Sequence, residues 1–196
     1  CMNFGLRDLS SVVAIDTERN LTKFNPIPAT SAMLPIDVQM TTPDLTFANA
    51  VRASMSLPAL EEPENGWPVA ILVHGITSTK EQMLPITGLL SLYGIATIAI
   101  DQPLHGSRGF DLNGDEVDDI NTSTVSTLHY VNLGSMLTMR DNTRQSTADL
   151  LGLRLGMNFL GGFESNGNPI KIDSSKVHLL GHSLGGIYGM NAVGLA

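Results

Sequence analysis

A serine enclosed by glycines, directly after a short apolar run, is the feature that most constrains what this chain can fold into. The apolar run covers 177–180, and the chain continues as Gly181-His182-Ser183-Leu184-Gly185-Gly186. This G-x-S-x-G pattern is typical of a sharp turn from a buried strand into a helix, where the serine has a strained backbone and its hydroxyl stands clear of the sheet. The pattern therefore predicts Ser183 as a nucleophile, with Gly181, His182 and Gly185 forming the turn around it.

Backbone amides that can stabilise a negatively charged oxygen are predicted on two sides of that serine. The N–H of Leu184 lies at the start of the predicted helix, where unpaired amides and the helix dipole favour negative charge. A second donor is expected from a loop after an earlier strand, and His74-Gly75-Ile76 directly follows the apolar run 69–73. We expect the Ile76 N–H to be this donor, with the Gly75 N–H as the alternative.

The apolar runs in the second part of the chain predict an α/β core. Buried strands are expected at 69–73 and 95–100 with an amphipathic helix over 79–93 between them, a spacing that requires a right-handed parallel crossover. A helical region is expected over 125–159, broken near 140–142, ahead of the final strand. The predicted fold class is therefore α/β, with a doubly wound, mostly parallel sheet.

Residues 1–68 lack this regular pattern, and we expect edge strands and loops there. They include an apolar run at 12–15, an alternating strand pattern at 36–40, a short helix over 45–55 and an acidic, proline-rich loop over 57–68. The sequence predicts one domain over 1–196, with 69–196 as its parallel core.

The charge balance argues against one large class of partners. Lysine and arginine total 11 against 19 for aspartate and glutamate, a net charge of −8, which disfavours nucleic acids and anionic membrane surfaces. The single cysteine, Cys1, cannot form an internal disulfide. No apolar run reaches the roughly 18 residues of a membrane span, and no signal-peptide pattern is present.

Several other residues have both a chemical and a structural interpretation. His105 follows a predicted strand and is a candidate base, but a loop-fixing role through local hydrogen bonds is favoured. His129, His178 and His182 are interpreted as packing or supporting groups. The leucine-rich stretch 150–160 is a candidate lipid contact, yet burial of a helix stripe in the core is the favoured interpretation.

An acidic loop carries a partial calcium-binding pattern. Oxygen-bearing side chains occupy positions 1, 3, 5 and 9 of such a loop, at Asp111, Asn113, Asp115 and Asp119. The pattern then fails, because a glutamate and a threonine stand where the loop needs glycine and a bidentate glutamate. A solvated acidic turn is favoured, so no metal or cofactor is expected, with calcium at these four residues as the alternative.

Three motifs together resemble the α/β-hydrolase superfamily, namely Ile71-Leu72-Val73-His74-Gly75, Asp101-Gln102-Pro103-Leu104-His105-Gly106-Ser107 and Gly181-His182-Ser183-Leu184-Gly185-Gly186. More narrowly, the segments 74–78, 103–110, 130–133 and 140–142 are similar to those of large bacterial extracellular lipases, which include surface-exposed lysophospholipases.

This resemblance implies an α/β-hydrolase fold and the hydrolysis of carboxylic esters through a serine acyl-enzyme, without a cofactor. A lipid, a lysophospholipid or a small ester is the implied substrate. The resemblance also implies an enzyme that is secreted or held at the bacterial outer-membrane surface, and it allows peripheral contact with a membrane.

The chain departs from the family pattern after the predicted nucleophile. In α/β-hydrolases the serine is followed along the chain by an acidic residue and then a histidine, but neither type follows Ser183 here. We therefore expect an N-terminal part of a longer enzyme, whose base and acid come from polypeptide beyond Ala196, and expect Ser183 alone to be a weak nucleophile. The alternatives are an acyltransferase or peptidase on the same fold, and a non-catalytic binding module.

Overall fold

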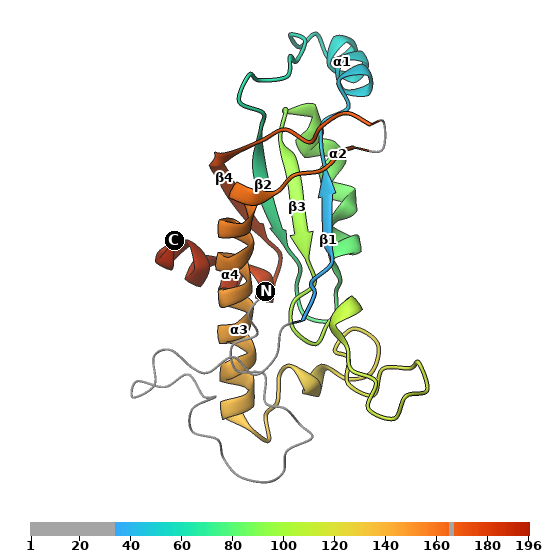
Figure 1. Cartoon of the computed structure of the whole chain (residues 1–196), viewed down its shortest axis with the longest axis vertical. Coiled ribbons are helices and arrows are strands. Elements are labelled where there is room, and N and C mark those ends of the chain that lie inside the picture. Colours follow the sequence, from blue (N-terminus) through green and yellow to red (C-terminus); the bar gives the residue numbers. More distant parts are fainter. Residues whose placement is uncertain (1–33, 165–166) are drawn as a thin grey trace.

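A mixed sheet organises the part of the chain that this computed structural model describes, residues 34–164 and 167–196 (Figure 1). Four strands lie there in the order β1-β3-β2-β4. The three parallel ones are β2 (Trp67–Val73), β3 (Ala96–Ile100) and β4 (Ile172–Gly181), and β1 (Val38–Thr41) pairs antiparallel with β3. The expected strand at 12–15 and Cys1 lie outside the described residues.

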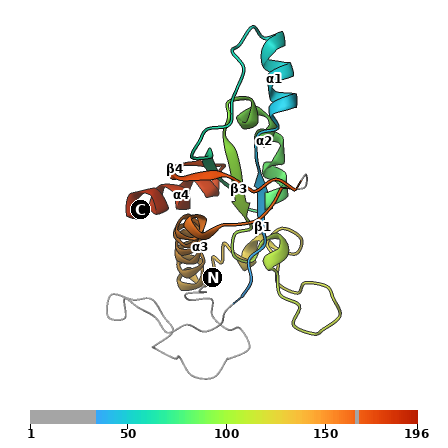
Figure 2. The same ribbon diagram turned by 45° about the horizontal axis from the view of Figure 1, so that its top comes forward.

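Helices cover both faces of this sheet. The α-helices are α1 (Leu45–Ser54), α2 (Leu84–Leu92), α3 (Met136–Gly156) and α4 (Leu184–Leu195). Helix α2 lies on one side of the strands, and α3 and α4 lie on the other (Figure 2). In the described part of the chain, no helix combines the length and the apolar character that a membrane crossing requires.

The central strands β2 and β3 are buried on both faces, as the unbroken apolar runs predict for parallel strands. Alternate side chains of a strand point to opposite faces, so each strand contributes to two apolar clusters. On the α3 and α4 side, the cluster includes Val69, Ile71, Ile98, Leu150, Leu153 and Tyr188. On the α2 side, it includes Ala70, Leu72, Ala99, Met83 and Leu90.

The helix predicted over 79–93 begins differently from the expectation. A 3₁₀ turn, Lys80–Met83, precedes α2, and Pro85 stands in the first turn of α2. Proline is tolerated there because the first amides of a helix have no intrahelical partner. Gly94, with a φ of +71°, ends the helix as expected.

The prediction of a helical region over 125–159, broken near 140–142, is wrong in its bounds and in its break. The structure has a 3₁₀ turn at Thr127–His129, then irregular chain, and α3 runs unbroken through 140–142. The Asn142 amide, a group that often favours a turn, instead donates to the carbonyls of His129 (3.3 Å) and Tyr130 (3.0 Å). Within the leucine-rich stretch, Leu150, Leu153 and Met157 pack in the core, whereas Leu155 and Phe159 are exposed.

Topology places the predicted functional segments at one edge of the sheet. Because β2, β3 and β4 run parallel, their carboxyl ends meet there. Those ends lead into His74, Asp101 and His182 respectively.

The turn into β2 provides a test of this arrangement. Gly66 has a φ of +88°, and a Cβ at this residue would stand 2.6 Å from the carbonyl carbon of Lys171. Gly114 has a similar φ of +82° but nothing within 4 Å. We expect Gly114→Ala to lower the free energy of unfolding by roughly 1–2 kcal/mol through backbone strain, and Gly66→Ala by roughly 3 kcal/mol or more. Urea denaturation of both variants measures this difference, and equal losses would contradict the packing of this turn against β4.

Candidate active site

Ser183 occupies the turn between β4 and α4 with a backbone that non-glycine residues seldom adopt. Its φ is 54° and its ψ is −125°, a conformation that costs of order 1–3 kcal/mol. The turn is held by hydrogen bonds from the amide of His182 to the carbonyl of Val73 (2.9 Å) and from the amide of Gly185 to the carbonyl of His182 (2.9 Å). The residue is exposed to solvent, so its hydroxyl is accessible at the sheet edge.

Glycines allow the close contacts around this turn. A Cβ at Gly181 would stand 2.6 Å from the carbonyl oxygen of Gly185, and a Cβ at Gly185 would overlap the carbonyl oxygens of Val73 and His74. The first turn of α4 therefore packs directly on the end of β2.

The loop after β2 reaches the predicted nucleophile. A Cβ at Gly75 would stand only 2.9 Å from the Cβ of Ser183 and 3.3 Å from Nδ1 of His182. The structure thus brings together the residues predicted to form the turn and those predicted to form the oxyanion loop.

Unpaired amides occur in the two segments next to Ser183. Within residues 34–164 and 167–196, the N–H groups of Gly75 and Ile76 donate no hydrogen bond. Leu184 is the first residue of α4, and the first amides of a helix have no intrahelical partner. Donors of this kind, held in place before reaction, can stabilise an oxyanion without reorganisation.

His74 uses both ring nitrogens to hold the loop after β2, which is the predicted oxyanion loop. Nδ1 lies 2.7 Å from the carbonyl oxygen of Gly75, and Nε2 accepts a hydrogen bond of 2.9 Å from the amide of Gln102. Burial lowers the pKa of His74 below its usual 6.5. The 3.9 Å separation of Nε2 from Oδ1 of Asp101 is therefore no ion pair, because Nε2 carries a lone pair and no proton.

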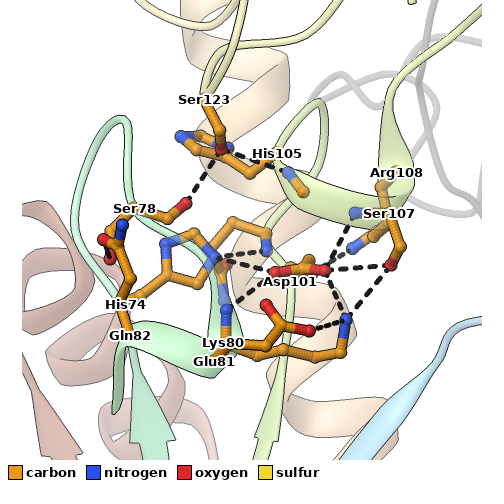
Figure 3. A network of polar contacts seen from close by, with 12 residues as sticks. His74, Ser78, Lys80, Glu81, Gln82, Asp101, His105, Ser107, Arg108 and Ser123 are labelled. Carbon is orange, nitrogen blue, oxygen red and sulfur yellow. Dashed lines mark hydrogen bonds and ion pairs between the residues drawn. The ribbon is translucent and has the colours of Figure 1, made fainter.

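A buried network centred on Asp101 supports the loops at this edge (Figure 3). Oδ1 accepts from the amide of Lys80 (2.8 Å), and Oδ2 accepts from Lys80 Nζ (2.7 Å) and from the amide (3.0 Å) and hydroxyl (2.9 Å) of Ser107. Burial alone would raise the pKa of Asp101, but the hydrogen bonds from Lys80 and Ser107 outweigh it and hold the pKa below its usual value. The carboxylate is therefore charged.

Arg108 links this network to α3. Its Nη1 donates to the carbonyl oxygen of Asp101 (3.0 Å) and to Oδ2 of Asp149 (2.7 Å). Sequence reasoning missed both ion pairs, Lys80 with Asp101 and Arg108 with Asp149. Their members are 21 and 41 positions apart, and no local pattern marks such partners.

The other histidines do not serve Ser183 in the described structure. His105 Nδ1 lies 2.8 Å from the carbonyl oxygen of Pro103, which is the loop-fixing role that the sequence favoured. His129 accepts from the amide of Asn121 (3.1 Å), and His178 is exposed rather than packed. Across residues 34–164 and 167–196, none of the chain's five histidines hydrogen-bonds the hydroxyl of Ser183.

The acidic loop is folded by its own carboxylates. Asp111 accepts from the amides of Asn113 (3.1 Å), Gly114 (2.7 Å) and Glu116 (2.8 Å), and Asp119 accepts from Leu112. The hydrogen bonds from Gly114 and Glu116 lower the pKa of Asp111. Over the described residues, no three His, Cys, Asp or Glu side chains gather as a metal site. The solvated acidic turn without a metal stays a prediction, and calcium binding stays its alternative.

Comparisons with known proteins bear on the family and the fold class. A family model described as "Alpha/beta hydrolase family" matches residues 70–196. Among solved structures, the chain is similar to the ferulic acid esterase from Streptomyces cinnamoneus, with 14% identity and a TM-score of 0.38, over 86% of this chain and 58% of that chain. The comparison with curated proteins gave no match. The family match and the mixed sheet with helices on both faces confirm the predicted fold class.

The buried imidazole of His105 makes the free energy of unfolding depend on pH. Burial lowers its pKa from 6.5 to about 4, so the unfolded chain takes up a proton before the folded chain does. The stabilisation is complete above about pH 6.5 and is lost as the pH falls toward 4, a loss of about 2 kcal/mol at pH 5 relative to pH 8. His74 acts in the same direction.

Urea denaturation at several pH values measures this loss. His105→Asn keeps an N–H donor near the place of Nδ1 but does not titrate, so this variant is expected to show a clearly shallower decline between pH 8 and pH 5. A decline as steep as that of the wild type would contradict the assignment to His105.

Proposed function

Because the chain belongs to the α/β-hydrolase family, we propose that it carries the nucleophile of a serine hydrolase that cleaves carboxylic esters. One observation carries this proposal. Ser183, exposed in a strained turn, lies against a loop with unpaired amides and at the start of a helix. This arrangement supplies a hydroxyl and oxyanion donors, two of the parts that acyl transfer at a serine requires.

The proposed reaction proceeds through an acyl-enzyme. Oγ of Ser183 attacks the ester carbonyl carbon while its proton passes to a base, and the carbonyl oxygen becomes an oxyanion that accepts hydrogen bonds from the amides of Leu184 and Ile76. Collapse of the oxyanion breaks the bond to the alkoxy oxygen, and the alcohol leaves with the proton from the base. Water then attacks the acyl group, which releases the acid and restores the hydroxyl.

The base is proposed to come from outside the described residues. His74 and His105 each hold a backbone carbonyl through Nδ1, and neither is hydrogen-bonded to Ser183. Without a base, only the oxyanion donors and substrate binding contribute, which leaves a small residual rate. The lack of a hydrogen bond from His74 or His105 to Ser183 also favours the second candidate function, a non-catalytic binding module.

A lipid or lysophospholipid is the proposed substrate class, at a secreted or outer-membrane-surface enzyme. The resemblance of the sequence to bacterial extracellular lipases supports it. So does the segment between β3 and α3, where several large apolar side chains are exposed: Val125, Leu128, Leu133 and, at the start of α3, Met136 and Leu137. Exposed apolar groups of this kind are suited to contact with acyl chains.

Replacing Ser183 tests the proposed nucleophile. In the intact protein from its native source, Ser183→Ala is expected to abolish labelling by a fluorophosphonate probe and to lower ester hydrolysis at least 10³-fold, because the variant lacks the attacking hydroxyl. Ser54→Ala, at an exposed serine of α1, is the control. Labelling that persists in the Ser183→Ala protein would remove the proposal, and an absence of labelling in the wild type would favour the binding module.

Gly75 tests the proximity of the oxyanion loop to the nucleophile. Its φ lies outside the left-handed region, so an alanine there is not strained by its backbone, but its Cβ would press on Ser183. We expect Gly75→Ala to lower kcat roughly 10²-fold through displaced donors. Gly88→Ala in α2, where nothing lies within 4 Å, is expected to leave kcat unchanged. Equal activity of the two variants, measured with a short-chain ester, would contradict the contact.

A further inference from the structure

His74 occupies a place from which it can orient the peptide that carries an oxyanion donor. We propose that His74, held as the neutral tautomer with its proton on Nδ1, aims the N–H of Ile76 at the oxyanion position beside Ser183, so that Ile76 rather than Gly75 supplies the second donor. This inference rests on the proposed function and assigns His74 as a positioning residue.

The peptide between Gly75 and Ile76 is held by its carbonyl. The oxygen of Gly75 accepts from Nδ1 of His74 (2.7 Å) and from the amide of Ser78 (3.3 Å). In a trans peptide the C=O and N–H bonds point in opposite directions. Fixing the Gly75 carbonyl therefore fixes the direction of the Ile76 N–H.

The order of the strands shows where that N–H points. The His74 ring reaches Gln102, directly after β3, so the Gly75 carbonyl faces the β3 side. Strand β2 lies between β3 and β4, and Ser183 follows β4. The opposite direction, that of the Ile76 N–H, is therefore the side of Ser183.

The preceding peptide excludes the alternative donor. The carbonyl oxygen of His74 lies against Gly185 so closely that a Cβ there would overlap it. That carbonyl faces the first turn of α4, so the Gly75 N–H of the same planar unit points away from it. Both amides are unpaired among the described residues, and these two carbonyl directions assign the Ile76 N–H as the second donor.

Backbone groups dictate the tautomer of His74. The amide of Gln102 can only donate, so Nε2 must accept, and the carbonyl of Gly75 can only accept, so Nδ1 must carry the proton. The ring is fully buried and packs edge-on against His105, with 5.1 Å between ring centroids. The nearby Asp101 carboxylate would favour a charged ring, but Lys80 and Ser107 already occupy its oxygens.

Two variants separate the two hydrogen bonds of the ring. His74→Asn places an N–H donor near the site of Nδ1 and loses the acceptor for Gln102. His74→Gln reaches the site of Nε2 with an acceptor and loses the donor to Gly75. In the intact enzyme we expect His74→Gln to lower kcat roughly 10²–10³-fold with little change in KM, the effect of losing one oxyanion donor. His74→Asn should stay within about tenfold of the wild type, and His178→Gln should match the wild type.

Melting temperatures decide between positioning and mere structural support. A kcat loss that is equal in the Asn and Gln variants, and that follows their melting temperatures, would overturn the positioning role. Retained kcat in His74→Gln would overturn it as well.

A spectroscopic readout does not depend on catalysis. In ¹⁵N-histidine NMR spectra of the chain near pH 7, His74 is expected to carry one proton, on Nδ1, and His74→Gln is expected to shift the Ile76 amide resonance. A proton on Nε2, or an unmoved Ile76 amide, would overturn the inference. Fluorophosphonate labelling that survives Ser183→Ala would instead remove the proposed function, so the two failures are distinguishable.

Discussion

The close packing of the first turn of α4 on the end of β2 is the contact on which the rest of the site depends. It exists because Gly185 has no side chain to meet the carbonyls of Val73 and His74. The same contact draws the oxyanion loop against Ser183 and leaves the serine in a strained conformation. Strain of this kind persists only where the surrounding structure determines it fully, and here parallel pairing of β2 with β4 and the glycine contacts together do so.

A second support lies on the other side of β2. The charged carboxylate of Asp101 joins the start of the 3₁₀ turn at Lys80 to the loop at Ser107, and Arg108 extends the connection to α3. A buried ion pair of this type adds little net stability, but removing one partner leaves an uncompensated buried charge. The network therefore fixes the start of the loop after β3, where the amide of the adjacent Gln102 donates to His74.

Local sequence patterns predicted the elements that are buried on all sides. The apolar runs at 69–73 and 95–100 became β2 and β3 because strands buried on both faces need apolar residues throughout. The G-x-S-x-G pattern predicted the turn at Ser183 because glycine is needed where a side chain would collide with the backbone. Elements whose limits depend on distant contacts were less predictable. The start of α3 and the absence of a break at Asn142 follow from hydrogen bonds to His129 and Tyr130, which no local pattern specifies.

For the site as well, some parts could be predicted from local motifs and others depend on contacts between distant segments. Sequence motifs predicted Ser183, Gly75 and the amides of Leu184 and Ile76. The choice between the Ile76 and Gly75 amides depends instead on the directions of two carbonyl groups. Strand order determines the direction of the Gly75 carbonyl, and the contact with Gly185 determines that of the His74 carbonyl. The partners of Asp101 depend on pairing between segments far apart in the chain. Motifs thus supplied the candidate groups, and tertiary packing determined their directions.

A crystal structure of the protein with a phosphonate covalently bound to Ser183 would show directly which amides stabilise the oxyanion, because the phosphonyl oxygen occupies the place of the oxyanion. This oxygen is expected to accept hydrogen bonds from the amides of Leu184 and Ile76 while His74 remains bonded to Gly75 and Gln102. A phosphonyl oxygen bound to the Gly75 amide, or contacting neither loop nor helix, would contradict it.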